Sequence, residues 1–171
     1  EIYIIDHSTT TFEAKNDFGG VYNKGGDFLY RWGHAQNYGH QGPSSEKLIF
    51  SPHDANWIQN GYPGSGNILV FSNNHDELNS AVIEIVPPIN EGGYYIDLFF
   101  GPSEYEWFYQ SNFYSSVQSG VQRLPNGNTL ITSTNESRIF EVDSLGIIHW
   151  NYNGDIINPP RAIKYYSNLT N

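Results

Sequence analysis

The chain lacks cysteine and methionine, and it carries little positive charge. Without cysteine, disulfides give no information about the redox compartment in which the protein works. A natural reading frame begins with methionine, so we expect a processed or truncated chain. The eight Lys and Arg residues are spread thinly over 171 positions. No cluster of them can follow a phosphate backbone, which argues against a nucleic acid partner.

Long apolar runs and metal-binding patterns are missing as well. No run approaches the ~20 residues that span a bilayer, and no signal peptide is visible, so we expect no membrane span. The histidines do not have the close spacing of zinc ligands. The loop at 73–77 is rich in oxygen ligands but lacks the spacing of a calcium loop, and we expect a plain hairpin there. The sequence therefore predicts neither a bound metal nor a cofactor.

Aromatic and turn-forming residues are abundant. Aromatic residues make up 16% of the sequence and charged residues 15%, with 17 glycines and 9 prolines. Short apolar runs separated by Gly, Pro, Asn and Ser favour an all-β fold, and the aromatic content argues against a disordered chain. The net charge of −10 favours a soluble surface and says little about the fold.

Strand-like runs that recur in the same order indicate an internal repeat. A Gly-Asn strand at 66–71 recurs at 127–132, and each copy is followed by a second apolar strand, at 80–86 and at 137–143. A third copy of the second strand opens the chain at 1–6. Each copy then leads to a strand that holds a tryptophan: Trp32, Trp107 and Trp150.

Four short antiparallel strands per repeat are the make-up of a propeller blade. Counted in this way, the chain holds half a blade (1–33), a full blade (50–110), another full blade (117–152) and the first strand of a further blade (160–166). The extra length of the first full blade falls in the loop 87–105. We therefore predict an all-β fold, a partial β-propeller of about two and a half to three blades. The three tryptophans then occupy one blade position and are expected to pack between blades.

A propeller closes with about 4–8 blades, so this number of blades cannot close. The open edges need cover, from the missing propeller half or from further copies of the chain. The alternative fold is a β-sandwich or another meander, in which the similarity between strands is accidental. The repeated order of four distinct strand types favours the propeller.

Several segments resemble the arylsulfotransferase family, in the family's order and over nearly the whole chain. The more specific segments are Asp-His-Ser-Thr-Thr-Thr at 6–11 and His-Asp-Ala at 53–55. The Arg-Leu-Pro-Asn-Gly-Asn run at 123–128 is shared with other propellers, so it indicates the fold more than the activity. The resemblance implies the C-terminal part of the propeller in secreted bacterial members, and therefore an extracytoplasmic location.

Members of this family move a sulfuryl group between phenol oxygens without a nucleotide cofactor, through a histidine that carries the group covalently. The resemblance therefore implies an aryl-sulfate sulfotransferase whose partner is an aryl sulfate or another phenolic small molecule. The motif places the nucleophile at His53, where Pro52 replaces the family's usual Gln. A second histidine and an arginine that hold the sulfate oxygens belong to segments expected before Glu1.

The residue chemistry near His53 supports the same role. His53 stands beside Asp54 at the start of a predicted strand, and neutral imidazole is a competent nucleophile near neutral pH. A sulfate ester is anionic and needs cations or N–H donors around its oxygens, and Arg123 in the matching strand of the next blade can supply one. Trp57 is a candidate to stack on an aromatic substrate. The competing interpretation is that His53 only caps or packs a strand end.

His7 is a further candidate for the substrate site. It follows Asp6 and precedes three threonines, so it can line the same mouth of the propeller. It can equally start a polar turn in which the hydroxyl groups bond the backbone, and we favour that interpretation.

Two functions from different classes stay open. The first is sulfuryl transfer through His53. The second is a non-enzymatic propeller segment that assembles with copies or a partner into a structural or binding surface. A glycan- or quinone-dependent propeller enzyme is a distant third, because such folds host many activities.

Overall fold

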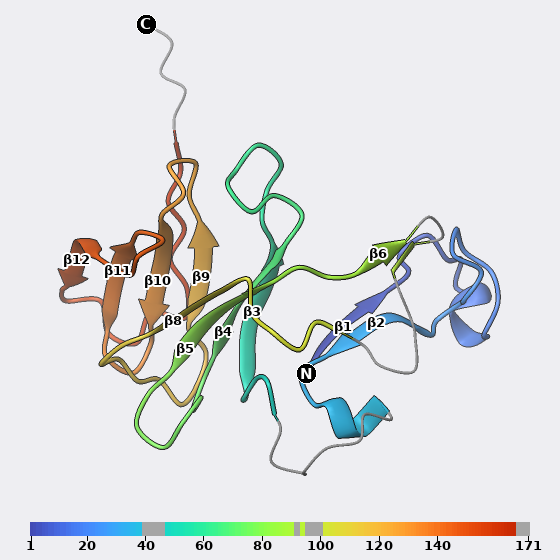
Figure 1. Ribbon diagram of the computed structural model, residues 1–171, viewed down its shortest axis with the longest axis horizontal. Helices are drawn as coiled ribbons and strands as arrows, with labels where there is room; N and C mark the ends of the chain where they lie inside the picture. Colours follow the sequence, from blue (N-terminus) through green and yellow to red (C-terminus); the bar gives the residue numbers. More distant parts are fainter. Residues whose placement is uncertain (39–46, 91–92, 95–100, 167–171) are drawn as a thin grey trace, which may run out of the picture. The chain divides into compact units, whose positions relative to one another are not determined.

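The computed structural model describes residues 1–38, 47–90, 93–94 and 101–166, and the chain divides into two compact units (Figure 1). The first unit consists of Glu1–Phe50 and Pro87–Glu104. The second unit consists of Ser51–Val86 and Tyr105–Asn171. The all-β prediction is confirmed, because the regular structure is mostly antiparallel strand, and the described helices are two short 3-10 turns in the first unit.

The first unit is built on one antiparallel strand pair with long polar turns. Its elements are β1 (Ile2–Ile5), η1 (Glu13–Lys15), β2 (Phe28–Trp32), η2 (Ala35–Tyr38), β6 (Ile89–Asn90) and β7 (Gly93–Tyr94). Strand β1 pairs with β2, and β6 pairs with β7. The Tyr30 hydroxyl and the Trp32 indole N–H donate to the carbonyls of Gly101 and Pro102, at 2.6 and 2.7 Å. Neither short helix in the described ranges is long or apolar enough to cross a membrane.

The second unit contains two four-stranded meanders, which we call the first sheet and the second sheet. The first sheet runs in the order β3 (Pro52–Trp57), β4 (Ile68–Ser72), β5 (Ala81–Ile85) and β8 (Trp107–Gln110). The second sheet runs in the order β9 (Gly120–Arg123), β10 (Thr129–Ser133), β11 (Arg138–Val142) and β12 (Ile148–Asn153).

Turn chemistry and apolar runs explain why these strands form where they do. The two middle strands of the first sheet are buried along their whole length, which matches their continuous apolar sequences. Gly66 and Gly127 precede the second strands with φ near +89° and +88°, a backbone conformation that side chains with a Cβ disfavour. The Asn after each glycine bonds a buried carboxylate on the third strand, described below.

The core of this unit lies between the two sheets. Its first-sheet members include Leu69, Phe71 and Val82, and its second-sheet members include Ile131 and Phe140. The ring of Phe113, from the connection between the sheets, packs on two of these aromatic rings with centroids 5.9 and 5.5 Å away. Apolar area buried from both sides fixes the two meanders face to face.

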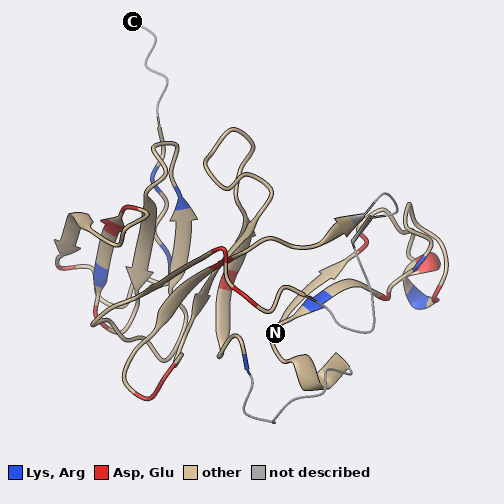
Figure 2. Cartoon of the chain, viewed as in Figure 1, with Lys and Arg blue, Asp and Glu red and all other residues tan. Residues whose placement is uncertain are grey.

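Charged side chains are few on the strands, and Figure 2 shows Lys and Arg dispersed over the described chain. Two acidic residues on third strands are nevertheless buried, Glu84 on β5 and Glu141 on β11. They occupy equivalent positions, because Glu84 pairs with Trp107 and Glu141 pairs with Trp150. A buried carboxylate needs compensating donors, so these two positions mark clusters with a specific structure.

The predicted order of strands is confirmed, with two corrections. The predicted strand at 160–166 is extended but forms no strand, since no second strand pairs with it within the described residues. Trp32 does not share the position of Trp107 and Trp150. Ile4, which matches Glu84 and Glu141 in the sequence repeat, pairs with Tyr30, so Tyr30 takes that position and Trp32 falls two residues further along, opposite Ile2.

The loop predicted at 87–105 is confirmed as an excursion from the first sheet. It leaves after β5, contributes β6 and β7 to the first unit, and returns at β8. The four strands of the 50–110 segment therefore pair as one meander despite the insertion. The described strands form open sheets, and no closed ring of sheets is found among them.

Candidate functional site

A β-bulge in the first strand of the first sheet creates the candidate site. His53 pairs with Phe71 and Asn56 pairs with Leu69, so two residues on β3 face one residue on β4. Asp54 lies inside this bulge with φ near +53°. Bulges of this kind re-aim side chains at the ends of sheets. Here the bulge turns Asp54 toward the second sheet while His53 stays exposed at the strand end.

The imidazole of His53 is held through one nitrogen. Its Nδ1 lies 2.7 Å from Oδ1 of Asn73 and 3.2 Å from the carbonyl oxygen of Ser51. Both neighbours are acceptors, so Nδ1 carries the proton and Nε2 keeps its lone pair. Nothing in the described part of the chain lies within hydrogen-bond distance of Nε2. An exposed nitrogen with a free lone pair is the arrangement that a nucleophilic histidine requires.

Asn73 is itself fixed by a buried hydrogen-bond network. Its Nδ2 donates to the carbonyl of Ser115 at 2.7 Å, which leaves Oδ1 to face His53. The same carbonyl accepts the hydroxyl of Ser80 at 3.1 Å, and the Ser115 N–H donates back to that hydroxyl at 2.9 Å. Asn73, Ser80 and the Ser115 side chain are fully buried. The network therefore connects His53 to the segment that joins the two sheets.

Asp54 brings three successive segments of the second unit together. Its Oδ2 accepts the N–H of Val121 on β9 at 2.9 Å, and its Oδ1 lies 3.1 Å from the guanidinium of Arg161. Burial raises the pKa of Asp54, and the Val121 N–H and the Arg161 charge oppose that rise. Gly120 permits the approach, because a Cβ there would lie 2.8 Å from the carboxylate and 2.9 Å from the Arg161 stem.

A cavity of about 270 Å³ runs along the same three segments. It is lined by residues of β3, of β9 and of the C-terminal tail, the segment 159–166. The lining residues are Asn56, Trp57, Ile58, Gln59, Gln122, Arg123, Arg161, Ile163 and Tyr165. The first strands of both sheets and the tail therefore share one open surface.

Arg123 does not lie with His53. Its guanidinium pairs with the buried Glu84 at 2.5 Å, and it lies 5.2 Å from the centroid of the Trp107 ring. Asn67 completes the cluster by donating to the other oxygen of Glu84 at 2.6 Å. Arg123 is only 8% exposed. Gly120 is the residue of β9 that occupies the position of His53 on β3, and Arg123 lies at the opposite end of β9. The structure gives it a partner inside the sheet packing, which is a different place from the predicted sulfate ligand.

Trp57 also lies apart from the imidazole of His53, and His7 belongs to the other unit. Trp57 pairs with Ile68, three positions along β4 from the partner of His53, so the two side chains project from opposite faces of the sheet. His7 belongs to the first unit, in a turn where Asp6 accepts both the N–H and the hydroxyl of Ser8 at 2.8 and 2.6 Å. The favoured interpretation of His7 as part of a polar turn is confirmed.

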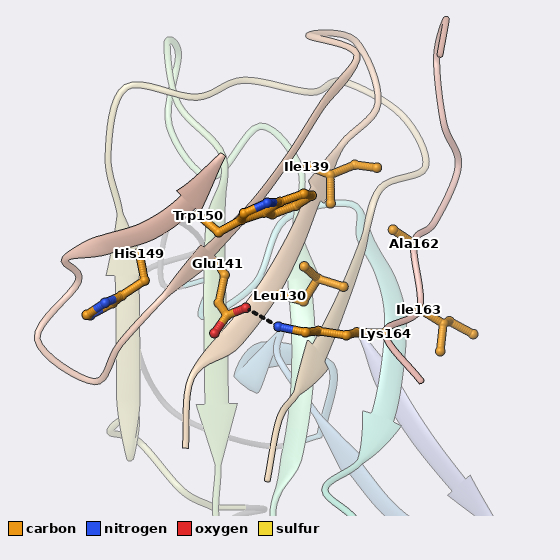
Figure 3. Close-up of a pocket in the computed structure, with 8 residues that line it drawn as sticks. All are labelled: Leu130, Ile139, Glu141, His149, Trp150, Ala162, Ile163 and Lys164. Atoms are coloured by element: carbon orange, nitrogen blue, oxygen red, sulfur yellow. Dashed lines mark hydrogen bonds and ion pairs between the residues drawn. The ribbon is translucent and has the colours of Figure 1, made fainter. Parts of the chain in front are cut away.

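The second sheet carries a cluster that matches the one around Glu84. Glu141 accepts Nζ of Lys164 at 2.7 Å and Nδ2 of Asn128 at 2.7 Å, with Trp150 alongside (Figure 3). Burial alone raises the pKa of Glu141, but the hydrogen bonds from Lys164 and the two asparagines outweigh it and lower the pKa. A cavity of about 520 Å³ adjoins the cluster, and Trp150 is 48% exposed beside it.

Two residues of the site were missed by the sequence analysis. The sequence predicts Asn73 only as part of a plain hairpin, and that hairpin is confirmed. The contact of Asn73 with His53 joins residues 20 positions apart, so no local pattern in the sequence indicates it. Arg161 was predicted only as part of a strand. Within the described ranges, no group of three or more His, Asp or Glu side chains is placed to hold a metal.

Comparison with family models, with curated proteins and with solved structures found no match.

Proposed function

We propose that the chain is a segment of a β-propeller in which His53 transfers a sulfuryl group from an aryl sulfate to an acceptor hydroxyl. The observation that carries the proposal is the state of the imidazole. Nδ1 is committed to Asn73 and Ser51, and the exposed Nε2 has a free lone pair. The resemblance to arylsulfotransferases supplies the reaction class, and the geometry around His53 supports a nucleophile there.

The proposed propeller fold is supported by contacts that each sheet repeats with the segment that follows it in the chain. Glu84 of the first sheet forms an ion pair with Arg123 of β9, and Glu141 of the second sheet forms an ion pair with Lys164 of the tail. A first-strand amide also reaches the backbone of the following segment in both cases, from Asn56 to Val121 and from Gln122 to the tail. The tail therefore makes the same kinds of contact with the second sheet as β9 makes with the first sheet. Repetition of this relation generates the blades of a propeller.

The chemistry proposed for His53 is a two-step displacement. The Nε2 lone pair forms an N–S bond as the bond between sulfur and the phenolic oxygen breaks, and the phenolate leaves with that electron pair. An acceptor hydroxyl then attacks sulfur, loses its proton to solvent, and takes the sulfuryl group from nitrogen, which regenerates the neutral imidazole. No oxidant, metal or nucleotide enters this balance.

Charge around the sulfuryl oxygens is the second requirement. Arg161 is the cation that the described structure places closest in the network, since it pairs with the residue that follows His53. Its side chain is 45% exposed, so its remaining N–H groups are accessible to an anion. We propose that Arg161, in place of Arg123, contributes to binding the sulfate ester.

The test is transfer to the protein from p-nitrophenyl sulfate, followed by peptide mass spectrometry. We expect sulfuryl on the peptide that contains His53, and its loss in His53→Ala. His149→Ala is the matched control, because His149 is also exposed on a strand but pairs with Asp143. Release of p-nitrophenol with no sulfuryl on the His53 peptide, or equal labelling in His53→Ala, would rule out this nucleophile.

A specific observation also supports the non-enzymatic alternative. The 520 Å³ cavity between the second sheet and the tail is lined by two exposed apolar side chains, Trp150 of β12 and Ile163 of the tail. An apolar face of this kind suits contact with the missing propeller half or with another copy of the chain. Sedimentation measurements decide between a single chain and an assembly, and an assembly without labelling of His53 would favour a binding or structural role.

A further inference from the structure

The position of Asn73 in the first sheet has a counterpart in the second sheet that serves a different purpose. Asn73 follows the last residue of β4, and Thr134 follows the last residue of β10 at the equivalent position. The Thr134 hydroxyl accepts the N–H of Ser119 at 2.8 Å and donates to the carbonyl of Pro159 at 2.8 Å. The Ser119 hydroxyl also donates to it at 3.3 Å, so the Thr134 hydroxyl bonds two backbone groups and one hydroxyl, and no ionisable side chain. The fold accepts threonine at this position, so the longer amide of Asn73 is not required by the sheet.

The Asn73 side chain is long enough for its amide to reach the imidazole of His53. Its amide spans from the Ser115 carbonyl on one side to Nδ1 of His53 on the other, at 2.7 Å in both directions. The Ser115 oxygen is an acceptor, so the amide nitrogen must face it. The reversed amide would bring two oxygens together at Ser115, and full burial of Asn73 excludes water as a mediator. Oδ1 therefore faces the imidazole in the one orientation that satisfies both neighbours.

We infer that Asn73 is a positioning residue that holds His53 as the Nδ1–H tautomer and thereby makes Nε2 the attacking atom. The catalytic use of this contact rests on the proposed sulfuryl transfer. The tautomer of His53, however, can be measured in the protein without substrate. Asn73 acts through His53 and contacts no reacting atom. A hydrogen-bonded partner that selects the imidazole tautomer is a general device for presenting the other nitrogen.

The experiment measures the tautomer directly and the transfer separately. The 171-residue chain is labelled with ¹⁵N-histidine, and the ring nitrogens of His53 are recorded by NMR at a pH where imidazole is neutral. The His53 signals are assigned from their loss in His53→Gln. We expect the pattern of a protonated Nδ1 and an unprotonated Nε2. An Nε2–H pattern in the unaltered chain would overturn the inference without any variant of Asn73.

The decisive variant is Asn73→Thr, because the chain itself carries threonine at the equivalent place in the second sheet. Threonine is too short to bond the imidazole, so His53 keeps only the 3.2 Å contact with the Ser51 carbonyl. We expect the signals to shift toward the Nε2–H form and capture of sulfuryl from p-nitrophenyl sulfate to slow roughly tenfold. An unchanged tautomer in Asn73→Thr would contradict the positioning role.

The two proposals fail in different ways. If the tautomer responds as expected but no sulfuryl reaches His53, sulfuryl transfer is wrong and the positioning role stands. If Asn73→Thr captures sulfuryl as fast as the unaltered chain, the transfer stands and the positioning role is wrong. Asn79→Ser is the matched control in the same hairpin, since Asn79 bonds Asp76 and leaves the His53 contact intact.

Discussion

Replacement of Arg123 by methionine removes the cation from a buried ion pair and tests where the structure places this side chain. Glu84 is 3% exposed, and Arg123 supplies its strongest donor. After the change, the carboxylate keeps only the amide of Asn67 at 2.6 Å. Loss of one partner from a buried pair costs about 3–5 kcal/mol, because a charge is left without compensation. Loss of the guanidinium over the Trp107 ring adds about 0.5–1 kcal/mol.

The second sheet provides the matched control. Lys164→Met removes the cation from the equivalent pair, but Lys164 is 45% exposed and Glu141 keeps the amides of Asn126 and Asn128. Water can also reach this carboxylate through the adjoining cavity. An ion pair whose cation is half-exposed, and whose carboxylate keeps other donors, contributes about 1 kcal/mol or less. We therefore expect Arg123→Met to lower the free energy of unfolding several times more than Lys164→Met does.

Urea denaturation followed by tryptophan fluorescence measures both variants, with the difference in unfolding free energy taken at a common slope. The double variant Arg123→Met, Glu84→Leu should recover most of the loss, because apolar residues of similar volume replace a buried pair at little cost. Equal effects of Arg123→Met and Lys164→Met would refute the buried pair. Arg123 would then be available to a ligand, as the sequence alone suggested.

Two further changes test the tail and the bulge. The pKa of Glu141 is lowered in the folded chain, so its ion pair with Lys164 stabilises the protein above the ordinary pKa and is lost as pH falls through the folded value. As the pH is lowered below about 5, the unfolding free energy should therefore fall more steeply than in Glu141→Gln, and parallel curves would contradict this. Gly120→Ala places a methyl group 2.8 Å from the Asp54 carboxylate, so it should lower the free energy of unfolding in urea by about 1–3 kcal/mol and speed tryptic cleavage after Arg161. An unchanged denaturation midpoint and cleavage rate would show that β9 does not approach Asp54 so closely.

Local sequence features predicted most of the strands in the described chain. Each of the runs 68–72 and 129–133 follows a Gly-Asn pair, and the strands there lie within one or two residues of the predicted bounds. The excess length at 87–105 was also visible as an insertion between two strands that nearly abut in the next repeat. These features depend on residues that are neighbours in the chain, so a single sequence is sufficient to identify them.

Bulges limited what could be inferred about positions within a strand. One extra residue at Asp54 shifts His53 into register with Gly120, and in the first pair Ile4 lies opposite Tyr30, where Trp32 was predicted. A shift of one residue moves a side chain to the other face of a sheet. His53 and Trp57 therefore project from opposite faces of the sheet, although both residues lie on β3 as predicted.

The sequence by itself determined the all-β class, the order of four strand types and the choice of His53 as the nucleophile to test. Only the tertiary structure decided what each polar side chain contacts. From the sequence, Arg123 is a possible ligand, but in the fold it pairs with Glu84, 39 positions away. The tautomer of His53 is likewise set by Asn73, which lies 20 positions away and is itself oriented by the carbonyl of Ser115. These contacts depend on how two sheets pack face to face, and such packing is set by the whole core and not by any local run of residues.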